Sequence, residues 1–123
     1  MTFDLELRTK RFSVALIKHL SALPRTLATD VIARQLLRSG TSIGANYREA
    51  NRAVSKADFG SKMGIVQKES SETQYWLELL QESGLDTSET AAALHQEATE
   101  LLAIFTTIGR KLKANQEAGD VRA

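Results

Sequence analysis

The stretch from Arg34 to Arg52 constrains the fold most, because its residues sort onto two opposite sides of a single helix. At about 100° per residue, one set of apolar side chains falls within roughly one sixth of a turn. This set is Ile32, Leu36, Ile43, Tyr47 and Ala50. The arginine stripe on the opposite side is Arg34, Arg38, Arg48 and Arg52. The pattern predicts a helix with one side in a core and a row of cations on the other side.

Two glycines, Gly40 and Gly44, fall inside this predicted helix, and each costs about 1 kcal/mol of helix stability relative to alanine. A break in the helix after Leu37 is therefore the alternative. The apolar phase before the glycines continues after them at Ile43 and Tyr47, whereas a loop of arbitrary length would have scrambled it. We expect a continuous helix whose small residues let a neighbouring backbone come close.

Apolar residues at helical spacing predict three further helices, and no segment alternates with the period of a strand. Leu23-Pro24 ends the first helix, because the residue before a proline avoids the α conformation. The third helix begins at Ser55 or Asp58 and ends before Gly84. The expected helices cover about residues 4–23, 29–53, 58–83 and 88–113, followed by a frayed tail over 114–123. This order predicts a single all-α domain, an antiparallel up-down-up-down four-helix bundle.

The chain of 123 residues has no cysteine, which excludes disulfides and thiolate chemistry and suits a cytoplasmic protein. Its apolar runs are far shorter than the ~20 residues that span a bilayer. Asp4 and Glu6 interrupt the start, where a signal peptide would need an apolar segment. We expect a cytoplasmic protein without membrane contact.

The net charge of +1 conceals an uneven distribution along the chain. Residues 31–68 carry seven basic and two acidic groups, whereas residues 69–109 carry eight acidic groups and no Lys or Arg. Such asymmetry predicts surfaces of opposite sign.

Neither histidine matches the Glu-x-x-His pairs of metal-binding bundles, because Leu16 and Ala92 stand three residues before His19 and His95. We interpret both as boundary histidines whose polar end is in water. The glycines match no nucleotide-binding loop, and no serine or threonine is marked as a nucleophile. The sequence predicts no metal site and no cofactor.

Four glutamates could form carboxylate pairs at helical spacing: Glu69, Glu72, Glu97 and Glu100. Solvated helix faces explain them more simply. An enzyme that uses such a pair in a pocket between subunits is the weakest of the functional alternatives, and we expect no enzymatic activity.

The arginine stripe is extended by Lys56, and further by Lys62 and Lys68. Its four arginines span roughly 27 Å at the helical rise, a length comparable to several phosphates of a duplex. Arginine forks also fit carboxylates, so acidic helices of a neighbouring subunit are an equal alternative. The candidate residues for binding nucleic acid or an acidic partner are Arg34, Arg38, Arg48, Arg52 and Lys56.

Tyr75 and Trp76 are adjacent, so at most one of the two rings points into the core. Trp76 also lies off the stripe from Phe59 to Leu77. We expect this pair to lie in an interface with another helix or subunit, since oligomerisation would bury apolar residues that fall outside the main stripes. Stacking on a nucleic-acid base is the alternative.

The segment QLLRSGTSIGANYREANRA, from Gln35 to Ala53, resembles bacterial four-helix-bundle proteins related to those encoded in ribosomal RNA intervening sequences. The matching positions are Gln35, Leu36, Arg38, Ser42, Ile43, Asn46 and Ala50. The resemblance extends to the start of the third helix around Phe59 and to the E-x-x-YWLELL stretch that ends at Leu80. Gly44-Ala45 stands where many members have Pro-Ser, which indicates a subgroup.

The resemblance implies a closed homo-oligomer, commonly a pentamer around a central channel, without established enzymatic activity. It also implies similarity to the accessory proteins of diversity-generating retroelements, basic pentamers that bind nucleic acid and a reverse transcriptase. The expected function is a non-enzymatic oligomer whose arginine stripe binds RNA or DNA. The alternative is a structural or adaptor protein whose arginines pair with acidic helices of neighbouring subunits or of a protein partner.

Overall fold

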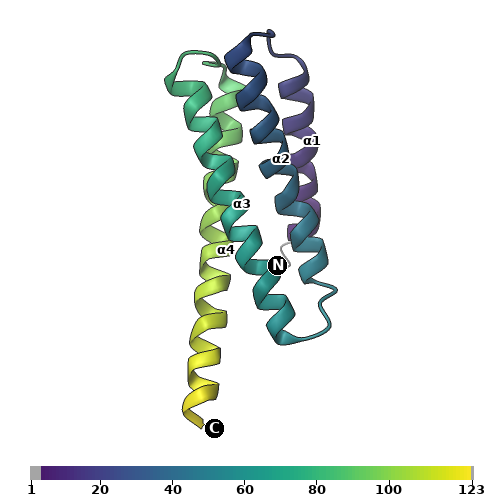
Figure 1. Ribbon diagram of the computed structural model, residues 1–123, viewed down its shortest axis with the longest axis vertical. Coiled ribbons are helices and arrows are strands. Elements are labelled where there is room, and N and C mark those ends of the chain that lie inside the picture. Colours follow the sequence, from purple (N-terminus) through teal and green to yellow (C-terminus); the bar gives the residue numbers. More distant parts are fainter. Residues whose placement is uncertain (1–3, 123) are drawn as a thin grey trace.

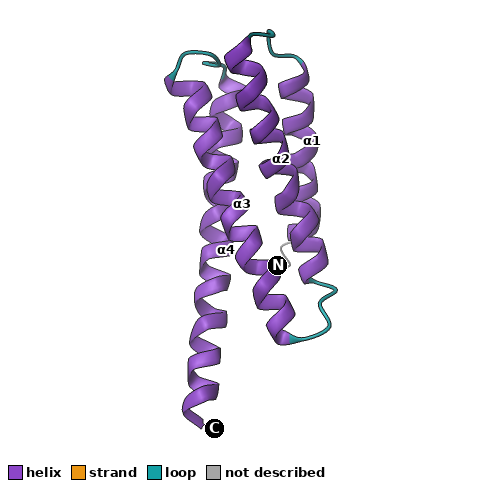
Figure 2. Cartoon of the chain, viewed as in Figure 1, coloured by secondary structure: helices purple, strands orange, loops and turns teal. Residues whose placement is uncertain are grey.

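The computed structural model describes residues 4–122, and their side chains as far as Ala118. Successive helices run in opposite directions, which confirms the predicted four-helix bundle (Figure 1). The described residues contain helices and loops and no strand (Figure 2). The helices are α1 (Leu5–Ser21), α2 (Leu27–Ala50), α3 (Lys56–Glu82) and α4 (Glu89–Arg122).

The capping residues determine where the helices begin and end, and these positions differ by a few residues from those that the apolar pattern predicted. Thr26 accepts a hydrogen bond from the backbone of Thr29 and caps α2, which begins at Leu27, two residues before the expected range of 29–53. The helix ends at Ala50, three residues before the end of that range. Ser55, rather than Asp58, caps α3. Gly84 has a φ of 78°, the left-handed conformation expected for the glycine that ends α3.

The prediction that the fourth helix ends near residue 113 is wrong, because α4 continues through Arg122. The segment after Lys113 contains no proline, and its first part includes the helix formers Ala114, Gln116, Glu117 and Ala118, so nothing there stops the helix where the apolar stripe ends. Figure 1 shows the C-terminal part of α4 extending past the ends of the other helices. Ala123 lies outside the described residues.

The helix α2 runs without a break through both glycines, as predicted. A Cβ atom at Gly40 would overlap the Cδ2 atom of Leu16, and one at Gly44 would lie 3.1 Å from the Oγ1 atom of Thr9. Both neighbours belong to α1. The glycines therefore allow close packing of α1 on α2, which offsets their cost in helix stability.

The helices pack in a ring in chain order, with the core at the centre. Its largest fully buried apolar side chains include Leu16, Leu36, Ile43, Leu77, Leu80, Leu101 and Phe105. The contact of α2 with α3 is the most extensive and that of α1 with α4 the smallest, with a groove of about 690 Å³ along the α1–α4 junction. The α2–α3 junction is thus the main structural contact of the bundle.

Candidate nucleic-acid interface

Arg34, Arg38 and Arg48 of the arginine stripe lie on α2, whereas Arg52 lies in the turn that follows it. The members of the stripe also have different partners. The side chain of Arg38 reaches across to α3, whereas Arg48 and Arg52 face the start of α1. Arg34 is exposed and forms no ion pair with the described side chains. The stripe is therefore divided between one structural arginine and three surface arginines.

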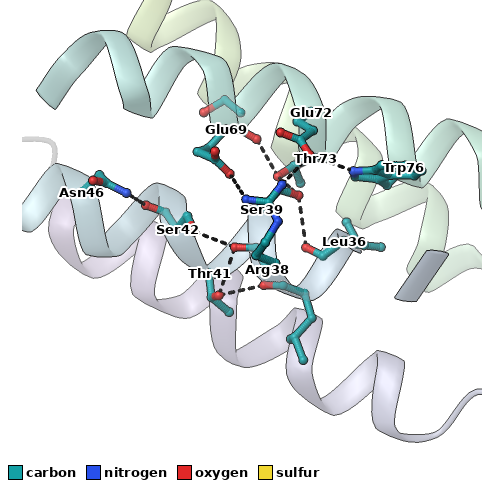
Figure 3. A network of polar contacts seen from close by, with 12 residues as sticks. Leu36, Arg38, Ser39, Thr41, Ser42, Asn46, Glu69, Glu72, Thr73 and Trp76 are labelled. Atoms are coloured by element: carbon teal, nitrogen blue, oxygen red, sulfur yellow. Dashed lines mark hydrogen bonds and ion pairs between the residues drawn. The ribbon is translucent and has the colours of Figure 1, made fainter. Parts of the chain in front are cut away.

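Arg38 bridges two glutamates that are one helical turn apart on α3. Its Nη1 atom lies 3.2 Å from Oε2 of Glu69, and its Nη2 atom donates to Oε1 of Glu72. The indole Nε1 of Trp76 donates to the same Glu72 oxygen at 3.3 Å (Figure 3). Hydrogen bonding to Glu72 is the largest cause that raises the pKa of Arg38. Burial alone would raise the pKa of Glu72, but the bonds from Arg38 and Trp76 outweigh it and the pKa is lowered.

A buried layer of hydroxyl groups lies beneath this bridge. Thr73 donates to the backbone carbonyl of Glu69 at 2.7 Å, and its Oγ1 atom lies 3.0 Å from Oγ of Ser39 on α2 (Figure 3). Glu69 itself is 6% exposed, so the expectation that it lies on a solvated face is wrong. Because a buried carboxylate needs a partner, Arg38 is tied to the α2–α3 junction.

A second bridge of the same kind joins α1 to α4. The Nε and Nη2 atoms of Arg8 donate to the two oxygens of Glu97 at 2.8 and 2.6 Å, and Nη2 lies 3.2 Å from Glu100. The hydrogen bond with Glu97 is the main cause that raises the pKa of Arg8. Each glutamate pair is thus held by one arginine. The sequence does show that the two glutamates of each pair are three residues apart. Nothing in the sequence, however, indicated that Arg8 would bind Glu97 and Glu100.

The cations that stay at the surface gather on α1, on α2 and in the turn that follows α2. The side chains of Arg48 and Arg52 are 56% and 66% exposed, and Lys10 of α1 lines a groove together with Arg48. We call Lys10, Arg34, Arg48 and Arg52 the basic surface. Lys56, also exposed and without an ion pair to a described side chain, begins α3 directly after the loop that follows Arg52.

The two lysines that extend the stripe lie on α3. Lys62 pairs with Glu49 at 3.5 Å, and Lys68 is exposed next to the buried Glu69. Lys62 therefore joins α2 to α3 and is less available than Lys68 to bind another molecule.

The histidines have acidic partners, and the interpretation of His19 as a boundary residue with a wet polar end is wrong. Its Nε2 atom lies 2.6 Å from Oδ2 of Asp86, which is 5% exposed. Burial would raise the pKa of Asp86, but hydrogen bonds from Ser88 and His19 together lower it. His95 lies 2.9 Å from Glu78 and is partly exposed. Across the described residues, no cluster of three or more acidic or histidine side chains could hold a metal ion.

Trp76 packs partly buried against the core of its own chain, whereas Tyr75 is 53% exposed. The two rings meet edge to face, with centroids 5.1 Å apart. Of the two predicted interface residues, Tyr75 is the one that offers a surface to another molecule.

No described helix combines the length and the apolar character that crossing a bilayer requires. Residues 4–107 match the family model described as 23S rRNA-intervening sequence protein. A similar solved structure is that of a protein with unknown function from the S23 ribosomal protein family of Bacteroides thetaiotaomicron. The two chains are 38% identical with a TM-score of 0.77, and the match covers 85% of this chain and 96% of that one. No curated protein matches the chain.

Proposed function

The chain belongs to the 23S rRNA-intervening sequence protein family, and we propose that it is a non-enzymatic protein that binds RNA or DNA. The basic surface of Lys10, Arg34, Arg48 and Arg52, with Lys56 beside it, contacts the phosphate backbone. The observation that carries the proposal is the division of the arginine stripe. Arg38 is occupied by two glutamates of its own chain, whereas Arg34 and Lys56 have no acidic partner among the described side chains.

The same division argues against the rival in which the stripe meets acidic helices of a neighbour. Glu69, Glu72, Glu97 and Glu100 already have arginine partners within the chain. They are therefore less available to cations from another subunit. Arg34 and Arg48 lie about 21 Å apart along α2 at the helical rise, and Arg52 follows in the next turn, so these arginines can contact several phosphates of a backbone.

The experiment is a titration of fluorescein-labelled RNA and DNA duplexes, followed by anisotropy at several salt concentrations. Phosphate contacts give affinity that falls steeply with salt and depends little on sequence. Arg34→Ala/Arg48→Ala should weaken binding to all duplexes alike. Arg110→Ala/Lys113→Ala removes the same charge from exposed positions on α4 and should have less than half that effect. Phosphate contacts are strongest at low salt, so if no duplex binds even at about 50 mM salt, the proposal is wrong.

We also propose that the protein forms a homo-oligomer through the outer side of α3, and the specific observation is its exposed apolar residues. Tyr75 is 53% exposed and Ile65 is 38% exposed on this helix. The family resemblance makes a pentamer the assembly to look for. In analytical ultracentrifugation, Tyr75→Ser/Ile65→Ser should lower the sedimentation coefficient, whereas Leu27→Ser, at an 87% exposed apolar residue of α2, should not. A monomeric wild-type protein at micromolar concentration would count against self-association.

A further inference from the structure

A carboxylate of the protein occupies the position between two surface arginines. A single oxygen of Glu6, Oε1, lies 3.1 Å from Nη1 of Arg52 and 3.7 Å from Nε of Arg48. Arg52 also donates from Nη1 to the backbone carbonyl of Arg48, which fixes the Arg52 side chain against the C-terminal end of α2. The protein thus already binds one anionic oxygen between two guanidinium groups.

The surroundings of this oxygen leave room for a larger anion. A groove of about 380 Å³ between α1 and α2 begins at Glu6, and Lys10 and Arg48 line it. Gly44, which has no side chain, and Ala45, which has only a methyl group, also line the groove. Lys10 has no ion pair with a described side chain, so the groove contains a further cation besides Arg48.

Glu6 is held loosely enough to be displaced. Its side chain is 35% exposed, and those of Arg48 and Arg52 are more exposed still. Solvent screens such pairs, and each contributes little to stability. Glu6 lies in the first turn of α1, where the helix dipole favours an anion of any origin. An anion that takes its place therefore meets two arginine forks, a lysine and the positive end of a helix.

We propose that this is a phosphate-binding site, formed by Lys10, Arg48 and Arg52, which Glu6 occupies in the free protein. The inference rests on the proposed function in one respect, namely that the phosphate belongs to a nucleic-acid backbone. Arginine forks match the oxygens of a phosphodiester as they match a carboxylate. Binding exchanges the Glu6 carboxylate for a backbone phosphate, so Glu6 acts as an internal competitor that lowers affinity.

The first test compares Glu6→Gln with wild-type protein in the anisotropy titration with labelled RNA duplex. Glu6→Gln keeps the size of the side chain and removes the competing charge, so affinity should rise about threefold to tenfold. Glu49→Gln is the matched control, because Glu49 lines the same groove but pairs with Lys62. It should change affinity by less than about twofold. In an Arg48→Ala/Arg52→Ala background, the gain from Glu6→Gln should disappear. Equal gains for Glu6→Gln and Glu49→Gln would mean a general charge effect and would overturn the site.

The second test uses inorganic phosphate alone and does not depend on nucleic acid. In ¹H–¹⁵N spectra, phosphate should shift the Nε–Hε signals of Arg48 and Arg52 at lower concentration in Glu6→Gln than in wild-type protein. If these shifts occur but no duplex binds either protein, the site stands and the nucleic-acid function fails. If duplex binds but phosphate leaves both signals unmoved in Glu6→Gln, the site fails and the function survives.

Discussion

Replacing Arg38 by methionine should destabilise the fold, whereas the same change at Arg34 should not. Both residues are arginines on α2, and the sequence alone assigned them to one stripe. Without Arg38, the carboxylate of Glu69, which is 6% exposed in the wild-type protein, loses its ion-pair partner at 3.2 Å. Glu72 loses a charged hydrogen bond as well.

The magnitude follows from these two contacts. A hydrogen bond to a charged group contributes about 1.5–3 kcal/mol, and a buried group without a partner carries its full desolvation penalty. Arg38 is itself 49% exposed, so solvent screening reduces this value, and we expect a loss of about 1–2 kcal/mol. For a domain of this size, the corresponding decrease in Tm is about 3–10 °C.

Urea unfolding followed by circular dichroism at 222 nm measures the effect. Arg38→Met should lower the midpoint without changing the m-value, and Arg34→Met should stay within about 0.5 kcal/mol of wild type. Adding Glu69→Gln to Arg38→Met should recover part of the loss, because it removes the unpaired buried charge. Equal stability of the Arg38 and Arg34 variants would refute the division of the stripe.

Three further predictions concern packing and charge. Gly44→Leu should destabilise the protein by about 1–3 kcal/mol in thermal melts, because Thr9 of α1 lies against Gly44, whereas Gly64→Ala, with open space around it, should stabilise by about 1 kcal/mol. Asp86→Asn should lower the free energy of unfolding at pH 7, measured by urea unfolding. Because the pKa of Asp86 is lowered in the folded state, its carboxylate stabilises the wild-type protein above about pH 4, and this stabilisation is lost as the pH falls through the folded-state pKa. The stability of Asp86→Asn should therefore change less with pH on the acid side. Arg8→Met should cost about 1–2 kcal/mol at low salt, and less at 1 M salt if the Arg8 bridge is electrostatic.

Helical periodicity was sufficient to predict the bundle, because the apolar phase survives the interruption at Gly40 and Gly44. The same pattern failed at the end of the chain. The apolar stripe of α4 ends at Leu112, so the stripe gave no reason to extend the helix, but no proline follows and α4 continues through Arg122, with Gln116 beside Gly60 of α3. Caps such as Ser55 then fixed boundaries that the stripes left uncertain by a few residues.

The candidate site was predicted by its residue types but not by its contacts. Helical angles place Arg38 and Arg48 on the same outward side of α2. This side is flanked by α1 and α3, and a long side chain can reach either of these two helices. Arg38 therefore meets α3 and Arg48 meets α1. The pair of His19 with Asp86 joins residues far apart in the chain, and no spacing rule identifies such a contact.

The salt dependence of RNA binding tests the central claim most directly. The affinity of wild-type protein for an RNA duplex should fall linearly with salt on logarithmic axes, and each lost phosphate contact should reduce the slope by about 0.9. We predict that Arg34→Ala/Arg48→Ala reduces the slope by about 2, while Arg38→Met, measured where it is still folded, leaves it unchanged within about 0.5. A slope that is the same for wild type and Arg34→Ala/Arg48→Ala, or one that falls most with Arg38→Met, would contradict the account.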